Sequence, residues 1–183
     1  MTTDPAVMQT ILAIVPKLRA FAISLSGNVD RADDLVQETL MRAIANIDSF
    51  EPGTNMQAWL FTILRNRFRS EYRKRRREVE DADGHYVDSL VAQPEQASRL
   101  EYKELRVALD KLPSDQREAL ILVGASGFSY EEAAAICGCA VGTIKSRVNR
   151  ARNRLAAELD VDGAEDFGPD RATRAVITAN QRR

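Results

Sequence analysis

Histidine and cysteine are almost missing from this 183-residue sequence, which contains only His85, Cys137 and Cys139 of these two types. Two cysteines this close together do not build a disulfide scaffold, and three ligands do not fill the four positions of a usual zinc site. The sequence also lacks a Ser/His/Asp, Cys/His or phosphate-loop arrangement typical of a catalytic centre. We therefore expect no metal, no cofactor, no small-molecule substrate and no enzymatic activity. Packing is the favoured interpretation of the two cysteines, and a redox role is the weaker alternative.

Long apolar runs are missing as well. We see no run approaching the roughly 18 residues that a membrane span needs. The apolar part of the N-terminal segment follows an acidic residue and is broken by Pro16, which is unlike a secretory signal. We therefore expect a cytoplasmic protein without membrane contact. Aromatic residues make up only 6% of the chain, against 44% hydrophobic and 29% charged residues, a composition that predicts a soluble all-α protein.

Charge is segregated along the chain although the formal net charge is only -1. Residues 65–77 contain eight Arg or Lys residues against one acid, and residues 138–155 contain five basic residues and no acid. Between them, residues 78–104 contain eight acids against two bases. This order indicates two modules that face nucleic acid, joined by an acidic connector able to shield them.

Breaks in the helical pattern place the boundaries of these modules. Residues 79–98 contain a glycine, a proline and several acids without a 3.6-residue repeat, which predicts a flexible linker. Residues 161–183 contain two glycines and a proline, which predicts a weakly ordered tail. We therefore expect a first module at residues 1–78 and a second at residues 99–160.

Two helices are predicted in the first half of the first module. The earlier one ends at a Ser-Gly-Asn sequence suited to a helix C-terminus. Its apolar stripe consists of Leu18, Phe21, Ala22 and Leu25. The apolar side of the next helix consists of Val36, Leu40, Ala43, Ile44 and Ile47. Its other side carries Asp33, Asp34, Gln37, Glu38 and Arg42, and by itself this pattern is typical of a solvated face.

A third helix, "AWLFTILRNRFRSEYRKRRR", has two faces that differ in kind. One is an apolar stripe of Leu60, Ile63, Leu64 and Phe68. Another side carries Trp59, Thr62, Asn66, Arg69, Ser70 and Arg73 at helical spacing. Polar side chains, a tryptophan for stacking and arginines for phosphates suit the capture of a DNA strand. The alternatives are that Trp59 belongs to the core and that the arginines are solvated.

The second module carries a helix-turn-helix pattern. Ser129 stands three residues before Glu132, which predicts a capping box at the start of a short helix. Ala134 is small where two helices must approach, Gly138 suits a turn with positive φ, and Ile144 suits a core anchor. The outward residues predicted to reach base edges or phosphates in the major groove are Thr143, Lys145, Ser146, Arg147 and Arg150.

Three motifs in this order resemble the bacterial extracytoplasmic-function sigma factors, which contain only sigma regions 2 and 4. The motifs are "DRADDLVQETLMRA", "AWLFTILRNRFRSEYRKRRR" and "SYEEAAAICGCAVGTIKSRVNRARNRL". The last motif is most similar to the alphaproteobacterial general-stress-response branch. The resemblance implies two helical domains that bind core RNA polymerase and promoter DNA, recognising and helping to open the −10 and −35 elements. It also implies an anti-sigma factor as a partner.

The resemblance further implies roles for individual residues. Those implied to bind polymerase are Asp33, Asp34, Leu35, Gln37 and Glu38. Those implied to contact the −10 element are Asn55, Trp59, Thr62, Asn66, Arg67, Ser70 and Arg73, with the loop of residues 49–57 receiving a flipped base. Those implied to read the −35 element are Thr143, Lys145, Ser146, Arg147 and Arg150. Ala140 departs from the family pattern, and losing a capping side chain there weakens the helix start by about 1 kcal/mol.

Two other classes of protein stay open on the residues alone. A stand-alone helix-turn-helix regulator would normally use a dimer surface and a palindromic site, and the first module shows no evident dimer seam. A sigma-like decoy would keep the shape without a role on DNA, and the presence of both basic segments weighs against it. Run-off transcription with purified core polymerase distinguishes these classes from a sigma factor.

Overall fold

The computed structural model describes residues 4–80 and 99–159, and every regular element within these ranges is a helix. The first range contains α1 (Pro5–Ser26), α2 (Val29–Ala45), the 3₁₀-helix η1 (Ile47–Ser49) and α3 (Met56–Glu80). The second range contains α4 (Arg99–Asp110), α5 (Ser114–Gly124), α6 (Tyr130–Cys137) and α7 (Val141–Glu158). The predicted all-α class is confirmed, with two helical modules.

The predicted linker and tail fall mostly outside the described residues. The first two positions of the expected linker, residues 79 and 80, form the end of α3. The rest of the linker and the tail at residues 161–183 lie outside the part of the chain that the structure describes.

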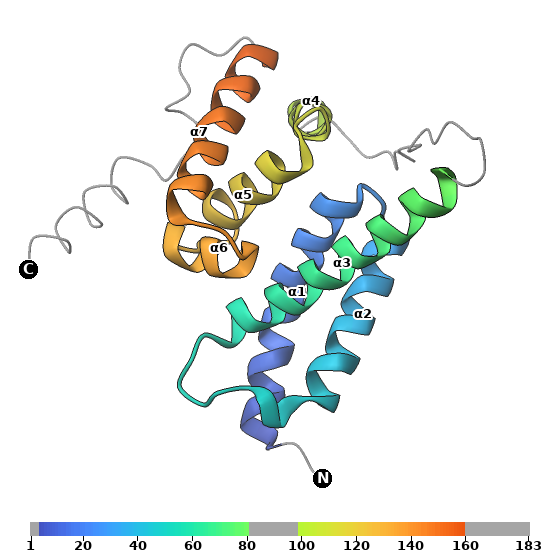
Figure 1. Ribbon diagram of the computed structural model, residues 1–183, viewed down its shortest axis with the longest axis vertical. Coiled ribbons are helices and arrows are strands. Elements are labelled where there is room, and N and C mark those ends of the chain that lie inside the picture. The colour runs from blue at the N-terminus through green and yellow to red at the C-terminus, as the bar shows by residue number, and fades with distance from the viewer. Residues whose placement is uncertain (1–3, 81–98, 160–183) are drawn as a thin grey trace, which may run out of the picture.

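Helix caps set the geometry of the first module. Asp4 accepts a hydrogen bond from the N–H of Ala6 (2.9 Å) and opens α1, and Asn28 accepts one from the N–H of Arg31 (2.9 Å) and opens α2. Between them Gly27 has φ 67°, a left-handed conformation that glycine adopts without steric cost. The predicted stop at Ser26-Gly27-Asn28 is confirmed. The turn lays α2 beside α1, and α3 crosses both (Figure 1).

Helix α1 differs from the sequence expectation at Pro16, which lies inside the helix and does not break it. Proline has no N–H to donate to the carbonyl of Leu12. Both residues are exposed, so water can donate a hydrogen bond to that carbonyl instead. The buried neighbours Ile14 and Leu18 hold the helix on both sides of the proline. The expectation about apolar runs was also wrong, because α1 is long and apolar enough by composition to cross a membrane. Its buried face packs against α2 and α3 as a core helix of the bundle.

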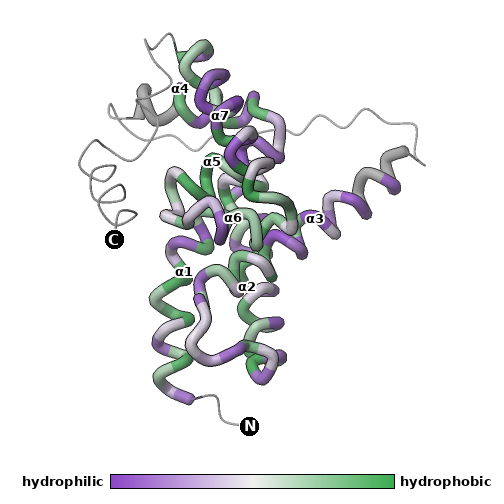
Figure 2. The backbone as a smooth tube through the Cα atoms, turned by 60° about the vertical axis from the view of Figure 1, so that its left-hand side comes forward, coloured by the Kyte–Doolittle hydropathy of each residue, from purple (hydrophilic) through white to green (hydrophobic). Residues whose placement is uncertain are grey.

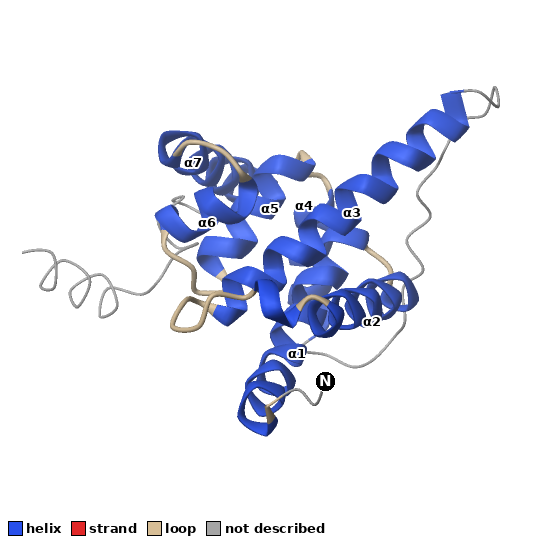
Figure 3. Cartoon of the chain, turned by 60° about the horizontal axis from the view of Figure 1, so that its bottom comes forward, coloured by secondary structure: helices blue, strands red, loops and turns tan. Residues whose placement is uncertain are grey.

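One apolar core runs through both modules. Phe61 of α3 stacks on Phe21 of α1 with a centroid distance of 4.8 Å and meets the edge of Phe128, just after α5, at 5.0 Å. All three rings are buried. Helix α3 therefore belongs to the core of the first module and to the interface with the second. Its second half projects beyond the bundle, and the residues that Figure 2 colours there are largely hydrophilic (Figures 2 and 3).

The second module folds around the predicted turn. Ser129 and Glu132 form a complete capping box, and Gly138 ends α6 with φ 61°. Ile144 is fully buried, as expected of the core anchor of α7. The N-cap residue Ala140 makes no side-chain hydrogen bond, which agrees with the weaker helix start expected from the sequence.

Two glycines of this module provide a matched test. Gly138→Ala should lower the free energy of unfolding by about 1–2 kcal/mol, because an L-residue is strained at φ 61°. Gly142→Ala, inside α7, should leave stability unchanged or raise it, because alanine has the higher helix propensity and no atom would contact its Cβ within 4 Å. Urea denaturation followed by circular dichroism measures both. A Gly138→Ala protein as stable as the parent would contradict the assigned turn.

Candidate functional site

The polar residues expected on the third helix are only partly gathered in space. Asn66, Ser70 and Arg73, here called the α3 face, are exposed and line one cleft of about 590 Å³ between α2, α3 and α5. The basic side chains lining this cleft are Arg31, Arg65, Arg69, Arg73 and Arg117. A cleft lined by guanidinium groups from three helices is suited to a strand that carries phosphates.

Other residues of the same predicted set lie elsewhere on the helix. Trp59 is half-buried and packs against Phe50 with a centroid distance of 5.3 Å, at the edge of the core. The hydroxyl of Thr62 donates to the carbonyl of Ala58 (2.8 Å). Arg67 turns away from the α3 face and forms ion pairs that fix it beside α2. The structure therefore brings together three of the seven residues implied at the −10 element.

The acidic side of α2 is partly tied to its neighbours. Asp33 accepts from Arg19 of α1 (2.6 Å), and that hydrogen bond lowers the pKa of the Asp33 carboxyl. Glu38 pairs with Arg67, whose pKa is raised first by this hydrogen bond. Asp34 and Gln37 are exposed and complete the α2 face, which we define as Asp33, Asp34, Gln37 and Glu38. Leu35 is different, because it is 1% exposed and supports the helix from the core instead of presenting a surface contact.

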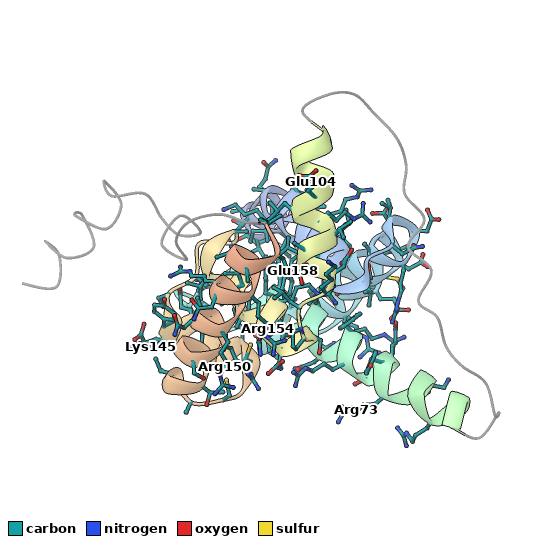
Figure 4. All side chains as sticks on the ribbon, turned by 90° about the horizontal axis from the view of Figure 1, so that it is seen from above. Arg73, Glu104, Lys145, Arg150, Arg154 and Glu158 are labelled. Carbon is teal, nitrogen blue, oxygen red and sulfur yellow. The ribbon has the colours of Figure 1, made fainter. Side chains whose placement is uncertain are left out.

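None of the residues predicted to point outward from α7 is fully buried. The α7 face consists of Thr143, Lys145, Ser146, Arg147 and Arg150. Lys145 and Arg150 are exposed and lie along the same edge of the view as Arg73 (Figure 4). Lys145 also lies over the ring of Tyr130 at 5.7 Å. Arg147 is half-buried and pairs with Asp115 of α5 (3.0 Å), so it also helps to hold α7 against the module.

Sequence reasoning missed the residues that join the modules. Glu118 of α5 is buried and accepts two hydrogen bonds from Arg65 of α3, at 2.6 Å and 3.3 Å. Arg69 reaches the same carboxylate at 3.4 Å. The sequence does indicate that these two residues are buried, because Arg65 and Glu118 each interrupt an apolar stripe of their helix. A charge in such a position needs a buried partner.

A second cross-module contact involves Glu132. Its carboxylate accepts from the N–H of Ser129 (2.9 Å) within the capping box and from the side chain of Asn55 (2.7 Å), which precedes α3. These hydrogen bonds, led by the one from Ser129, lower the pKa of Glu132. Gln57 adds a hydrogen bond to the carbonyl of Ser126 (3.2 Å). Asn55, expected to contact DNA, is therefore bound here by the other module.

The two cysteines differ in their surroundings. Cys137 is buried beside the turn, and burial raises the pKa of its thiol to about 12. Cys139 is half-buried with its sulfur 3.8 Å from the guanidinium of Arg147. The favoured interpretation, packing, fits Cys137, since a thiol with so high a pKa is a poor nucleophile.

Two family models match the chain in sequence order. Residues 11–78 match sigma-70 region 2, and residues 102–155 match sigma-70 region 4. The chain is 78% identical over 170 residues to the ECF RNA polymerase sigma factor EcfG of Rhodopseudomonas palustris (strain TIE-1), covering 93% of this chain and 94% of that protein.

Two solved structures extend the comparison to three dimensions. The sigma factor RpoE from Bartonella quintana, solved in complex with the anti-sigma factor NepR, superposes with a TM-score of 0.82 at 59% identity. That match covers 87% of this chain and all of the other. CnrH, solved in complex with the cytosolic domain of CnrY, gives a TM-score of 0.64 at 30% identity, covering 88% and 92% of the two chains.

The difference between the cysteines can be tested by alkylation. At pH 8 a thiol with a pKa of about 12 is ionised in only about one molecule in ten thousand. Iodoacetamide should therefore modify Cys139 in the folded protein and leave Cys137 unmodified, whereas both should react in guanidinium chloride. Mass spectrometry of the peptides gives the two rates. Equal rates in the folded protein would contradict the burial of Cys137.

Proposed function

The chain belongs to the extracytoplasmic-function sigma factors of the sigma-70 family, and from that membership we propose how its surfaces bind core RNA polymerase and promoter DNA in the cytoplasm. The observation that carries the proposal is the presence of regions 2 and 4, in that order, on two modules that each expose a basic face. The protein supplies specificity, and the polymerase supplies the chemistry.

Region 2 provides the polymerase contact and the −10 contact on different helices. Asp34 and Gln37 of the α2 face are exposed and suited to polar contacts with polymerase, whereas Asp33 and Glu38 are each paired with an arginine. The α3 face and its cleft are suited to the unpaired −10 strand. Capturing a flipped base in the loop of residues 49–57 offsets the few kcal/mol that unstacking costs, so binding itself favours opening.

Region 4 provides the −35 contact through α7. The start of α7 would enter the major groove, with Thr143, Lys145 and Ser146 near base edges. Arg147 and Arg150 would supply a base contact or phosphate contacts; a bidentate arginine gives about 1–3 kcal/mol of discrimination, whereas a phosphate contact gives affinity without sequence choice. To make such a contact, Arg147 must leave Asp115 and bind DNA instead.

An anti-sigma factor completes the proposed partners. The Bartonella relative was solved with the anti-sigma factor NepR, and CnrH was solved with CnrY. We extend this property to the present chain and place it in a stress response, since RpoE and EcfG are its relatives. A stand-alone regulator is disfavoured because such a protein has no need of the α2 face. A decoy is disfavoured because it has no need of the two basic faces.

Polymerase binding can be tested on the α2 face with two exposed glutamines. Gln37→Ala should weaken binding to core polymerase about 2- to 10-fold, because it removes one hydrogen bond at the interface. Gln9→Ala, exposed on α1, is the matched control and should bind like the parent. Fluorescence titration of labelled polymerase gives the affinities. Identical affinities for both variants would remove Gln37 from the interface.

Promoter reading can be tested on the α7 face by run-off transcription. Arg147→Ala should reduce initiation about tenfold on a promoter with an intact −35 element and have little effect when that element is scrambled. Asp115→Asn is the control, because it breaks the same ion pair and leaves the arginine available for DNA. Output that does not change across promoter variants would refute the assignment of Arg147, and no transcription by the parent protein would refute the proposed function.

A further inference from the structure

The interface between the modules covers the side of α3 that lies next to the α3 face. Phe61 and Phe128 form its apolar centre, with ring centroids 5.0 Å apart and both side chains buried. Polar contacts surround this centre, from Glu118 to Arg65 and Arg69 and from Glu132 to Asn55. An interface with a buried apolar centre and satisfied polar groups around it is typical of a specific contact.

The carboxylate of Glu118 is bound by arginines of the helix that is proposed to contact the −10 strand. It is held by two guanidinium groups from successive turns of α3, Arg65 at 2.6 Å and Arg69 at 3.4 Å. Arginine binds carboxylate and phosphate oxygens with the same geometry, so the carboxylate uses the donors that a nucleic-acid strand would need. The loop before α3 is engaged in the same way, since Asn55 donates to Glu132.

We propose that the free protein is self-inhibited, with Glu118 acting as an internal phosphate mimic that latches region 4 onto the −10 helix. This inference rests on the proposed function, since it assumes that α3 reads the −10 element. In the closed form the modules lie against each other, and region 4 keeps Arg65, Arg69 and Asn55 occupied. In the open form these side chains are available to DNA.

The energetics of a buried ion pair explain why such a latch can open. Arg65 and Glu118 have side chains only 5% and 4% exposed, so pairing them costs much of the hydration of both ions. Their attraction then largely offsets this desolvation, and the net contribution is small. The closed form is therefore specific without being permanent. Removing the charge of Glu118 alone would leave Arg65 buried without a counter-ion, a state that the chain can relieve by opening.

The cleft beside the latch gives DNA a route to displace it. Arg69 is exposed, whereas Arg65 is buried, and both line the cleft together with Glu118. A strand that enters along Arg73 reaches Arg69 first and Arg65 only after the carboxylate has left. Phosphates can thus replace Glu118 one arginine at a time.

The arrangement of the two modules matches that of a related sigma factor. The superposition on the Bartonella sigma factor covers 87% of this chain, which requires both modules to match in one arrangement. That relative was solved with its anti-sigma factor. The present chain holds the corresponding arrangement through contacts between its own modules.

The full-length protein carrying Glu118→Gln tests the latch. Glu158→Gln is the matched control, because Glu158 pairs with Lys111 inside region 4 (2.5 Å) and not across the interface. Two measurements are made on each protein: small-angle X-ray scattering of the free chain, and titration against a fluorescent single-stranded DNA oligonucleotide, the ligand of the residues that the latch occupies. When only the open form binds, the apparent affinity rises in proportion to the open fraction, so an increase of about tenfold is expected for Glu118→Gln. Its radius of gyration should also increase, while Glu158→Gln should match the parent.

A second variant guards against misfolding. Arg106→Gln removes the hydrogen bond from Arg106 to the carbonyl of Gly27 (3.0 Å), which joins the modules away from α3. It should shift both measurements in the same direction by a smaller factor, with helix content checked by circular dichroism. Unchanged scattering and affinity in both variants would overturn the latch. Polymerase binding by the parent decides the proposed function separately, because the scattering comparison does not depend on it.

Discussion

The ion pair between Arg65 and Glu118 constrains the arrangement of the whole molecule. Both charges are removed from water in the packed form, and each tolerates this only while the other is beside it. A partial separation of the modules would strand one charge in an apolar setting. The pair therefore favours two arrangements, one fully packed and one with both charges hydrated, and disfavours those in between. A weak interface made only of surface charges would instead separate gradually.

Local structure within each module does not depend on this pair. Region 2 is organised by the Asp4 and Asn28 caps and by the stacking of Phe21 on Phe61. Region 4 is organised by its capping box and by the left-handed turn at Gly138. The residues proposed to contact DNA thus lie on helices that are fixed by their own module. The interface changes how accessible those residues are, because Arg65 and Asn55 cannot bind DNA and region 4 at the same time.

The accuracy of the sequence predictions follows the range of the interactions involved. The helix ends at Gly27 and Gly138 were predictable because a cap is decided within a few residues. Pro16 was misjudged because packing of Ile14 and Leu18 outweighs one lost hydrogen bond. Arg67 and Leu35 were assigned from the family pattern, and the structure turns the first towards Glu38 and buries the second.

The central pair was beyond reach of the sequence for a similar reason. Arg65 and Glu118 lie 53 positions apart, and periodicity shows only that each interrupts an apolar stripe. It does not show which charge each will meet. The acidic connector was expected to shield the basic faces, whereas among the described residues the carboxylates that meet α3 and the loop before it come from α2, α5 and α6, inside the folded modules.

The double use of Glu132 has a consequence for how such a protein can diverge. One carboxylate closes the capping box of α6 and also receives Asn55 from the other module. A substitution at this position would disturb the fold of region 4 together with the contact, so selection has little freedom there. The carboxylate of Glu118, in contrast, caps no helix, and the hydrogen bonds that it accepts come from arginines of α3. A substitution at position 118 would therefore alter the contact between the modules without removing a helix cap.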